Sequence, residues 1–373
     1  MKTVGLICEF NPFHNGHAYI LGELRKRGAD RIVCVMSGNF VQRGEPAIMP
    51  SFLRAEAAVL NGADLCVELP FPWSSSSAAY FAHAGMAVLK SIGADAVGFG
   101  SECCDIDKLV LLSEKGLPPK GNAGSAGIAG DFFGEAVAPN DILAAEYIKQ
   151  SRRLSWNPEF IPVKRAGCAH DSPDTGGDYL SASAIRKSIY VSGSAAGLPQ
   201  SSAGILSRAM SDGLCPPDYA VFERIIVTNL RIADSEIVNR CAECSGGVGG
   251  RIISAACACD EKHSFASLCA TKKYTDSRLR RASLFALTGV TADDLAGTPG
   301  YVRLLAANST GRGILYENKG SQIKIVTKER EIPDNPDCAR RHLLADRADA
   351  LYGMLFDKRF ESSFFAKTRP AIV

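Results

Sequence analysis

The sequence contains no run of hydrophobic residues long enough to cross a membrane. A membrane-spanning helix needs at least about 18 consecutive apolar residues, and no stretch of the 373 residues provides them. A strong charge imbalance is also missing, because 42 Lys and Arg face 40 Asp and Glu, for a net charge of +2. No bulk electrostatic field therefore attracts a polyanion. Any contact with nucleic acid must come from a local basic patch.

Disulfide bonds and a secretion signal are not expected either. The 13 cysteines are odd in number and scattered, which is typical of reduced thiols in a cytoplasm. The first apolar run, residues 4–8, meets Glu9 at once and is too short for a signal peptide. We therefore expect a cytoplasmic protein with no membrane partner.

One stretch near the N-terminus organises the chain. Residues 4–8 predict a buried strand, and residues 18–27 predict a helix that ends on basic side chains. Between them, His14 and His17 form a His-x-Gly-His pattern at or just before the helix N-terminus. Such an end favours phosphate, and each imidazole adds a donor, and a charge as well if protonated. Two structural histidines are the alternative, but the strand, turn and helix favour phosphate binding.

A second candidate anion site lies at residues 181–187. A serine is expected to cap a helix that starts at Ser183–Arg186, with Arg186 within its first turn. The planar guanidinium of Arg186 suits the β- and γ-phosphates of a nucleotide. A Ser-x-x-Arg helix start is common as a purely structural feature. Its pairing with the histidine motif makes the phosphate interpretation specific.

Alternating elements predict the fold class. Strands are expected at 31–36, 64–70, 96–100 and 159–163, and helices at 51–61, 78–92 and from 139, with Ser51 and Asn140 as N-caps. This order indicates an α/β, Rossmann-like, doubly wound parallel sheet. The loop 37–47 lies at the carboxyl end of the second strand, where ligands bind in such sheets. Its polar side chains are either donors for a ligand or ordinary solvated groups.

Domain boundaries follow from composition. Residues 115–134 are rich in Gly, Pro and Ala and predict a loop or disordered insert. A Gly- and Ser-rich boundary at 191–203 divides an ATP-binding domain, 1–195, from a C-terminal domain, 196–373. Apolar residues at 219, 222, 226 and 230 predict a helix there, and one alternating run occupies 323–326. We expect the C-terminal domain to be mostly helical.

Two features of the C-terminal half have competing interpretations. The basic run 272–281 carries a tyrosine and offers Lys272, Lys273, Arg278 and Arg281 to nucleic-acid phosphates, although most such runs are only solvated. Four cysteines, Cys241, Cys244, Cys257 and Cys259, could form a zinc site. Their spacing departs from that of a zinc ribbon, so buried inert thiols are favoured and no metal site is predicted.

With these elements in place, the chain resembles the tRNA(Met) cytidine acetate ligase family, a branch of the HxGH nucleotidyltransferase-like superfamily. The resemblance covers residues 4–108 and 139–189 and returns weakly over 271–281 and 301–305. Its motifs are Glu9-Phe10-Asn11-Pro12-Phe13-His14-Asn15-Gly16-His17, Ser37-Gly38-Asn39-Phe40-Val41-Gln42-Arg43-Gly44-Glu45-Pro46, Asn61-Gly62-Ala63-Asp64, Phe99-Gly100-Ser101-Glu102, Pro139-Asn140-Asp141-Ile142-Leu143 and Ser181-Ala182-Ser183-Ala184-Ile185-Arg186. Residues 115–134 and the glycine-rich 245–250 depart from the family pattern.

The resemblance implies a two-step activity. ATP activates acetate as acetyl-adenylate, and the acetyl group then passes to N4 of the wobble cytidine of elongator methionine tRNA. It implies His14 and His17 as catalytic residues, Mg²⁺ carried by the triphosphate, and no protein partner. The ATP-binding positions are Ile7, Cys8, Glu9, Phe10, Asn11, Pro12, Phe13, His14, Asn15, Gly16, His17, Ala18, Tyr19, Ile20, Gly100, Asn140 and Arg165, with Ser183 and Arg186 from the second anion site.

Two other functions stay open on the sequence alone. A small-molecule adenylyltransferase shares both phosphate elements but leaves the C-terminal half unexplained. A non-catalytic nucleotide- and RNA-binding protein would use the same pocket without turnover.

Overall fold

The centre of the protein is one mostly parallel sheet. The structure is a computed structural model, and it describes residues 1–115, 137–165, 179–358 and 360–373. The strands lie in the order β5-β4-β1-β2-β3-β6-β7, with β8 paired to β6. They are β1 (Thr3–Cys8), β2 (Arg31–Ser37), β3 (Leu65–Leu69), β4 (Ala96–Ser101), β5 (Glu159–Lys164), β6 (Tyr301–Ala307), β7 (Lys324–Val326) and β8 (Ala371–Ile372). The predicted α/β class with a Rossmann-like parallel core is confirmed.

The sheet also takes strands from the C-terminal half. β6 runs antiparallel to β3, and β7 and β8 then run parallel to β6. The strand at 301–307 was not predicted, and the expectation of a mostly helical 196–373 is incomplete to that extent. The boundary near residue 195 stays a prediction. Most of the buried hydrophobic side chains of the described residues form one continuous cluster that runs from the sheet into the C-terminal helices.

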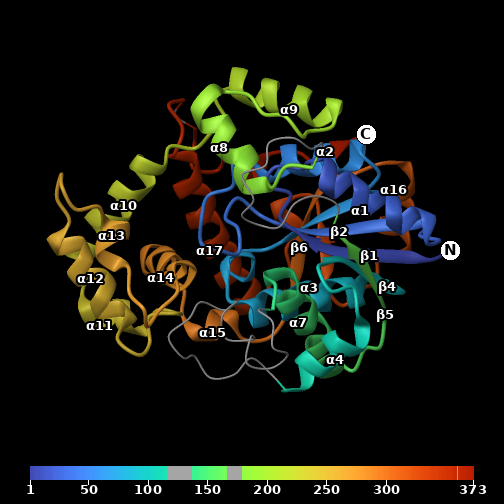
Figure 1. Ribbon diagram of the computed structural model, residues 1–373, viewed down its shortest axis with the longest axis horizontal. Coiled ribbons are helices and arrows are strands. Elements are labelled where there is room, and N and C mark those ends of the chain that lie inside the picture. The colour runs from blue at the N-terminus through green and yellow to red at the C-terminus, as the bar shows by residue number, and fades with distance from the viewer. Residues whose placement is uncertain (116–136, 166–178, 359) are drawn as a thin grey trace.

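Helices cover both faces of the sheet (Figure 1). α1 (Asn15–Lys26) packs on the face that carries Gly98, where an added Cβ would lie 2.7 Å from Leu24. α3 (Ala78–Ile92) packs on the opposite face, where a Cβ on Gly85 would lie 2.5 Å from Ile7. The missing side chains let helix and strand approach closely. Other helices of this part are α2 (Ser51–Leu60), α4 (Ile106–Lys115), α7 (Pro139–Arg153), α8 (Ala182–Ser192), α9 (Gln200–Ser211), α16 (Ser309–Glu317), α17 (Pro336–Gly353) and α18 (Phe364–Lys367).

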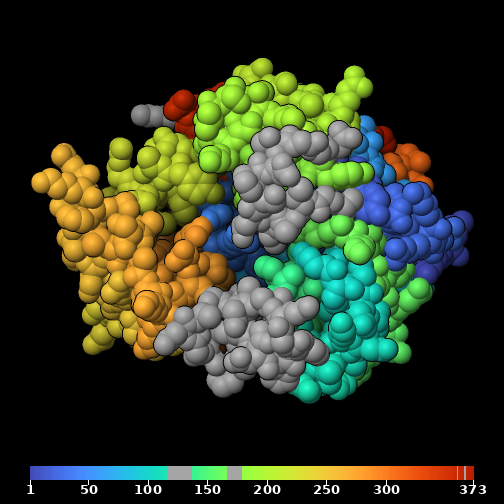
Figure 2. Space-filling model, in the orientation of Figure 1, coloured from blue at the N-terminus to red at the C-terminus, as the bar shows by residue number. Residues whose placement is uncertain are grey.

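A helical lobe stands beside the α/β part, at the left in Figure 2. It consists of α10 (Tyr219–Ile232), α11 (Ser235–Arg240), α12 (Val248–Ala258), α13 (Phe265–Cys269) and α14 (Asp276–Thr288), and α15 (Ala292–Leu295) leads back to β6. The predicted apolar stripe of α10 is buried at Phe222, Ile226 and Leu230. Within the described part of the chain, no helix combines the length and the hydropathy that a membrane crossing requires.

Two predicted helix caps are wrong. Pro50 is the N-cap of α2, so Ser51 is already helical. Ala138 is the N-cap of α7, which places Asn140 inside its first turn. In α7, Pro139 occupies the first helical position, which its fixed φ suits, whereas in α2 Pro50 is itself the cap residue. The predicted loop at 115–134 lies outside the described residues, apart from Lys115 at the end of α4.

The strand order places a ligand crevice between β1 and β4. β2 and β3 follow on one side of β1, whereas β4 and β5 lie on the other. In open α/β sheets, ligands bind outside the carboxyl ends of the strands at the point where the order reverses. The segment after Cys8 and the turn after Ser101 both leave the sheet at this point.

Candidate active site

The loop after β1 positions the histidine motif. It contains a cis peptide bond between Asn11 and Pro12, and Phe10 adopts a left-handed φ of 46°. The buried Phe10 ring meets the His17 ring edge-on, with centroids 4.9 Å apart. Phe13, which is also buried, lies 5.6 Å from the same imidazole. The His17 ring is therefore held by two aromatic side chains.

His14 and His17 form a reciprocal cap at the start of α1. His14 is the N-cap residue, and its Nδ1 accepts a hydrogen bond from the Gly16 N–H at 3.0 Å. Nδ1 of His17 accepts the N–H of His14 at 3.3 Å. Because Nδ1 is an acceptor in both rings, each neutral imidazole carries its proton on Nε2. Two N–H donors are thus available at the positive end of the helix.

Both imidazoles are neutral at physiological pH. Burial, followed by the positive charges of Arg165 and Arg186, lowers the pKa of His14 to about 4. Burial, His14 and Arg165 hold the pKa of His17 well below its usual value. The two rings lie 3.8 Å apart, so two positive charges here would repel each other. The sequence left open whether the two imidazoles are neutral or protonated, and the structure indicates the neutral form.

α8 carries the second anion site, with one correction. The N-cap is Ser181, whose hydroxyl accepts a backbone N–H of the first turn at 3.2 Å. The helix therefore starts before the expected Ser183, and Arg186 lies in the second turn, not the first. From there its Nη1 donates to the Asn11 carbonyl at 2.8 Å. This bond joins the two elements that the sequence predicted to bind phosphate, and Ser183 lies exposed beside it.

Glu102 links two other candidate positions and lies two residues after a third. Its Oε1 accepts a hydrogen bond from Asn140 Nδ2 at 2.6 Å and lies 3.5 Å from Nη1 of Arg165. Gly100 precedes it on β4, where an added Cβ would lie 3.3 Å from Ile20 of α1. β4, β5 and α7 therefore meet at one carboxylate. Glu102 is absent from the predicted ligand set, although its position directly after a strand was a signal for it.

Asp141 holds the turn that carries Glu102. Its Oδ1 accepts hydrogen bonds from the Ser101 hydroxyl at 2.6 Å and from the Glu102 N–H at 3.1 Å. Its Oδ2 accepts the N–H of Cys103 at 3.2 Å. The side chain is buried, so these bonds are shielded from water. Asp141 positions the site from the first turn of α7.

Arg54 is a second residue that the sequence did not reveal. It is fully buried in α2 and donates to four backbone carbonyls, those of Glu9, Ser37, Gly38 and Met49. It therefore ties the loop after β1 to the end of β2. The only local signal was an arginine at the centre of an alanine-rich helix.

Polar groups in the loop after β2 form hydrogen bonds with other parts of the protein. Asn39 is buried, donates to Asp349 at 2.7 Å and accepts the N–H of Ser51 at 2.9 Å. The N–H of Gln42 donates to the Glu9 carboxylate at 3.0 Å. Arg43 is exposed. Of the polar side chains that the sequence offered here, Asn39 supports the fold.

The other predicted ATP positions lie on β1, on α1 and in the loop between them. Ile7 and Cys8 end β1, and the residues Asn15, Gly16, Ala18, Tyr19 and Ile20 belong to α1. Pro12 follows the cis peptide bond. The cluster gathers around the crevice between β1 and β4, together with Gly100, Asn140, Arg165, Ser183 and Arg186.

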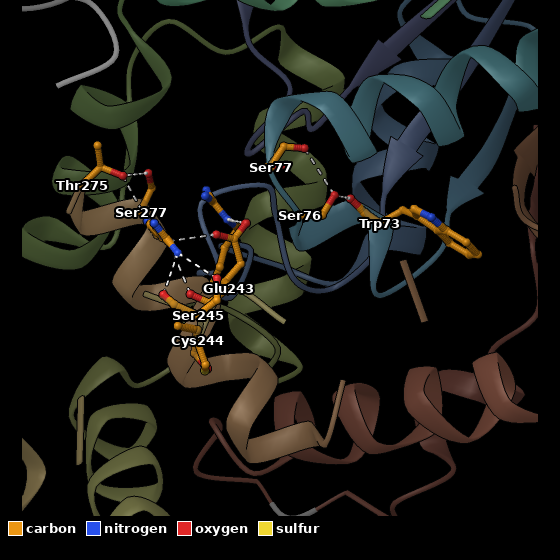
Figure 3. A network of polar contacts seen from close by, with 11 residues as sticks. Trp73, Ser76, Ser77, Glu243, Cys244, Ser245, Thr275 and Ser277 are labelled. Atoms are coloured by element: carbon orange, nitrogen blue, oxygen red, sulfur yellow. Dashed lines mark hydrogen bonds and ion pairs between the residues drawn. The ribbon is translucent and has the colours of Figure 1, made fainter. Parts of the chain in front are cut away.

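The basic segment of the lobe is partly paired. Arg278 Nε and Arg281 Nε lie 3.4 Å and 3.1 Å from the Glu243 carboxylate, and all three side chains are mostly buried. Arg278 also donates to the Ser245 carbonyl at 3.0 Å. Figure 3 shows Glu243 and Ser245 in this network, beside the start of α14 at Thr275 and Ser277. Lys272 and Lys273 are exposed.

The four cysteines that were weighed as a possible zinc site do not converge. The Cys241 and Cys244 thiols are buried and contact backbone carbonyls of Ile237 and Ala282 at 3.4 Å and 3.7 Å. Cys257 is exposed. In the described ranges, no group of three or more His, Cys, Asp or Glu side chains could hold a metal ion.

Comparison with known proteins settles the family. The profile of a family described as HIGH Nucleotidyl Transferase matches residues 1–117 and 128–365. The tRNA(Met) cytidine acetate ligase of Acetivibrio thermocellus is 35% identical over 368 residues, which cover 88% of each chain. The corresponding ligase of Limosilactobacillus reuteri is 34% identical and covers 90% of this chain and 92% of its own. This chain belongs to the tRNA(Met) cytidine acetate ligase family.

Solved structures of the ligase family share the whole fold. The apo crystal structure of Thermotoga maritima TmcAL has a TM-score of 0.89 and 28% sequence identity, with all of both chains covered. A second structure of that protein, bound with alpha-thio ATP, has a TM-score of 0.86 and 27% identity over the same coverage. The family therefore includes a protein of this fold that binds an ATP analogue.

Proposed function

We propose that this protein activates acetate with ATP and acetylates N4 of the wobble cytidine of elongator tRNA(Met). An acetate oxygen attacks the α-phosphorus of ATP, and pyrophosphate leaves. The cytidine amine then attacks the carbonyl of acetyl-adenylate, and AMP leaves. Membership in the ligase family supports this activity, and the two Nε2–H donors at the start of α1 support the site.

The residues supply charge stabilisation and position. No protein nucleophile is required, because acetate and the amine perform both attacks. His14 and His17 donate through Nε2 to phosphate oxygens, and the positive end of the α1 dipole adds to the charge stabilisation. Arg165 and Arg186 supply positive charge from two other elements, since both lower the pKa of His14. Mg²⁺ arrives on the triphosphate and needs no protein cage.

The first test changes His17 to Ala and measures acetate-dependent exchange between ATP and pyrophosphate. Loss of one preorganised donor lowers such rates by roughly 10²–10³-fold. His263→Ala is the matched control, because that imidazole is exposed in the lobe, 3.0 Å from Asp260. Unchanged exchange in His17→Ala would remove this histidine from the mechanism. A stable dinucleotide product would instead identify a small-molecule adenylyltransferase.

We further propose that tRNA contacts the lobe through Lys272, Lys273, Arg278 and Arg281. The two lysines are exposed, whereas the two arginines already bind Glu243. The arginines therefore reach phosphate only in competition with that carboxylate, and the lysines carry more of the salt dependence.

The test compares Lys272→Ala/Lys273→Ala with Arg278→Ala/Arg281→Ala across a salt series. The lysine pair should flatten the slope of log affinity against log salt by about two charges and leave ATP–pyrophosphate exchange intact. The arginine pair should lower the free energy of unfolding as well, because Glu243 would remain partly buried without a partner. An unchanged salt slope in both variants would place the tRNA elsewhere.

A further inference from the structure

Two adjacent cysteines lie at the rim of the nucleotide site. Cys103 is exposed and Cys104 is partly exposed, whereas Cys34 and Cys66 are fully buried in the sheet. Both belong to the turn between β4 and α4. Cys104 adopts a left-handed φ of 50°, which is unusual for any residue with a side chain. The pair therefore combines accessibility with a strained backbone.

The turn gathers both sulfurs around one residue. Cys103 Sγ lies 3.6 Å from the Ser101 hydroxyl, and Cys104 Sγ lies 3.5 Å from the Ser101 carbonyl. The N–H of Cys104 donates to the same hydroxyl at 2.9 Å. The N–H groups of Glu102 and Cys103 are held by Asp141. Glu102 therefore belongs to the same hydrogen-bonded turn as both cysteines.

A disulfide between Cys103 and Cys104 requires a change in the backbone of this turn. Consecutive Cα atoms are about 3.8 Å apart, whereas ordinary disulfides join Cα atoms about 4.4–6.8 Å apart. The ring can close only if the turn alters its dihedral angles. Strained and exposed disulfides are readily reduced, so the change is reversible.

We propose that Cys103 and Cys104 are an oxidation site whose disulfide withdraws Glu102, releases the Asn140 and Arg165 side chains that Glu102 holds in position, and so weakens ATP binding. The inference rests on the proposed function, because it requires ATP at these residues. The Cys103 thiolate attacks hydrogen peroxide, the O–O bond breaks, and a sulfenic acid and hydroxide form. The Cys104 thiolate then displaces hydroxide from that sulfur and forms the S–S bond. Two thiols and one peroxide give one disulfide and two waters.

The order of the two steps follows from the surroundings. Cys103 is the more exposed thiol, so peroxide reaches it first. Burial raises the pKa of Cys104, so a smaller fraction of this thiol is ionised and it attacks second. Cys104 is therefore the resolving thiol.

The experiment treats the full chain with one equivalent of hydrogen peroxide and measures ATP affinity before oxidation, after it, and after dithiothreitol. The dissociation constant should rise at least about tenfold, which corresponds to about 1.4 kcal/mol, and reductant should restore it. Mass spectrometry should find the peptide with both cysteines lighter by two hydrogens. Cys103→Ser and Cys104→Ser should bind ATP normally and resist peroxide.

Cys257→Ser is the matched control, because that thiol is also exposed but lies in the lobe. It should leave the peroxide response unchanged. The proposal is overturned if the disulfide forms and ATP affinity stays the same, if only Cys103 adducts appear, or if Cys257→Ser abolishes the response. Failure of the reduced protein to bind ATP would instead contradict the proposed function.

Discussion

Replacing Arg54 with Met should destabilise the protein strongly. The guanidinium is fully buried and donates to the carbonyls of Glu9, Ser37, Gly38 and Met49. A hydrogen bond to a charged group contributes about 1.5–3 kcal/mol, so four of them contribute roughly 6–12 kcal/mol. Burial of the charge costs several kcal/mol in return. The expected net loss is about 3 kcal/mol, a large part of the stability of a typical domain.

The assay is equilibrium unfolding in urea, followed by ATP binding without denaturant. Arg208→Met is the matched control, because Arg208 also extends from a helix but pairs with Glu56 near the surface, with 49% of its side chain exposed. Exposed ion pairs contribute little, so this control should lose at most about 0.5 kcal/mol. ATP affinity should fall in Arg54→Met, because Glu9 and Gly38 flank the site. Equal losses in both variants would refute the reasoning.

Two further predictions concern pH and backbone packing. The folded pKa of His14 is about 4 and its unfolded value is near 6.5, so the unfolded chain binds the proton first as pH falls. The free energy of unfolding should drop by about 3 kcal/mol from pH 6.5 to 4 through this residue, and His14→Asn, which keeps an N-cap oxygen, should flatten that slope. Gly44→Ala should cost about 1–3 kcal/mol in urea unfolding, because φ is +73° and the Cβ would lie 2.7 Å from the Arg281 backbone nitrogen.

The backbone prediction has a control in a second glycine. Gly22 lies within α1 with no neighbouring atom within 4 Å of an added Cβ, so Gly22→Ala should stabilise the helix by about 0.5–1 kcal/mol. An equal pH slope in wild type and His14→Asn would show that His14 is not neutral in the folded protein. A fully stable Gly44→Ala would mean that the loop after β2 and α14 can separate without cost.

The sequence determined the features whose causes are local. Strand β1, the histidine motif and α1 occupy one short stretch, and their apolar pattern and turn residues act over a few positions. The alternation of strands and helices then limited the architecture to a parallel α/β sheet. Local signals were weaker at helix starts, where Pro50 and Ala138 took the cap positions expected at Ser51 and Asn140.

Only the tertiary structure decided which distant residues meet. Glu102, Asn140 and Arg165 come from three segments of the chain. The strand order brings Asn140 and Arg165 to the carboxylate of Glu102. β6 joins the sheet antiparallel to β3 across more than 200 residues, a pairing that no local pattern specifies.

The charge and the availability of ionisable side chains were also decided by the tertiary structure. The sequence presented Arg278 and Arg281 as available cations, but Glu243, which lies 35 and 38 residues earlier in the chain, binds both. The neutrality of His14 likewise depends on burial and on Arg165 and Arg186, which only folding brings near. Sequence sets which groups a chain carries, whereas packing sets their solvation and their partners, and hence their charge and availability.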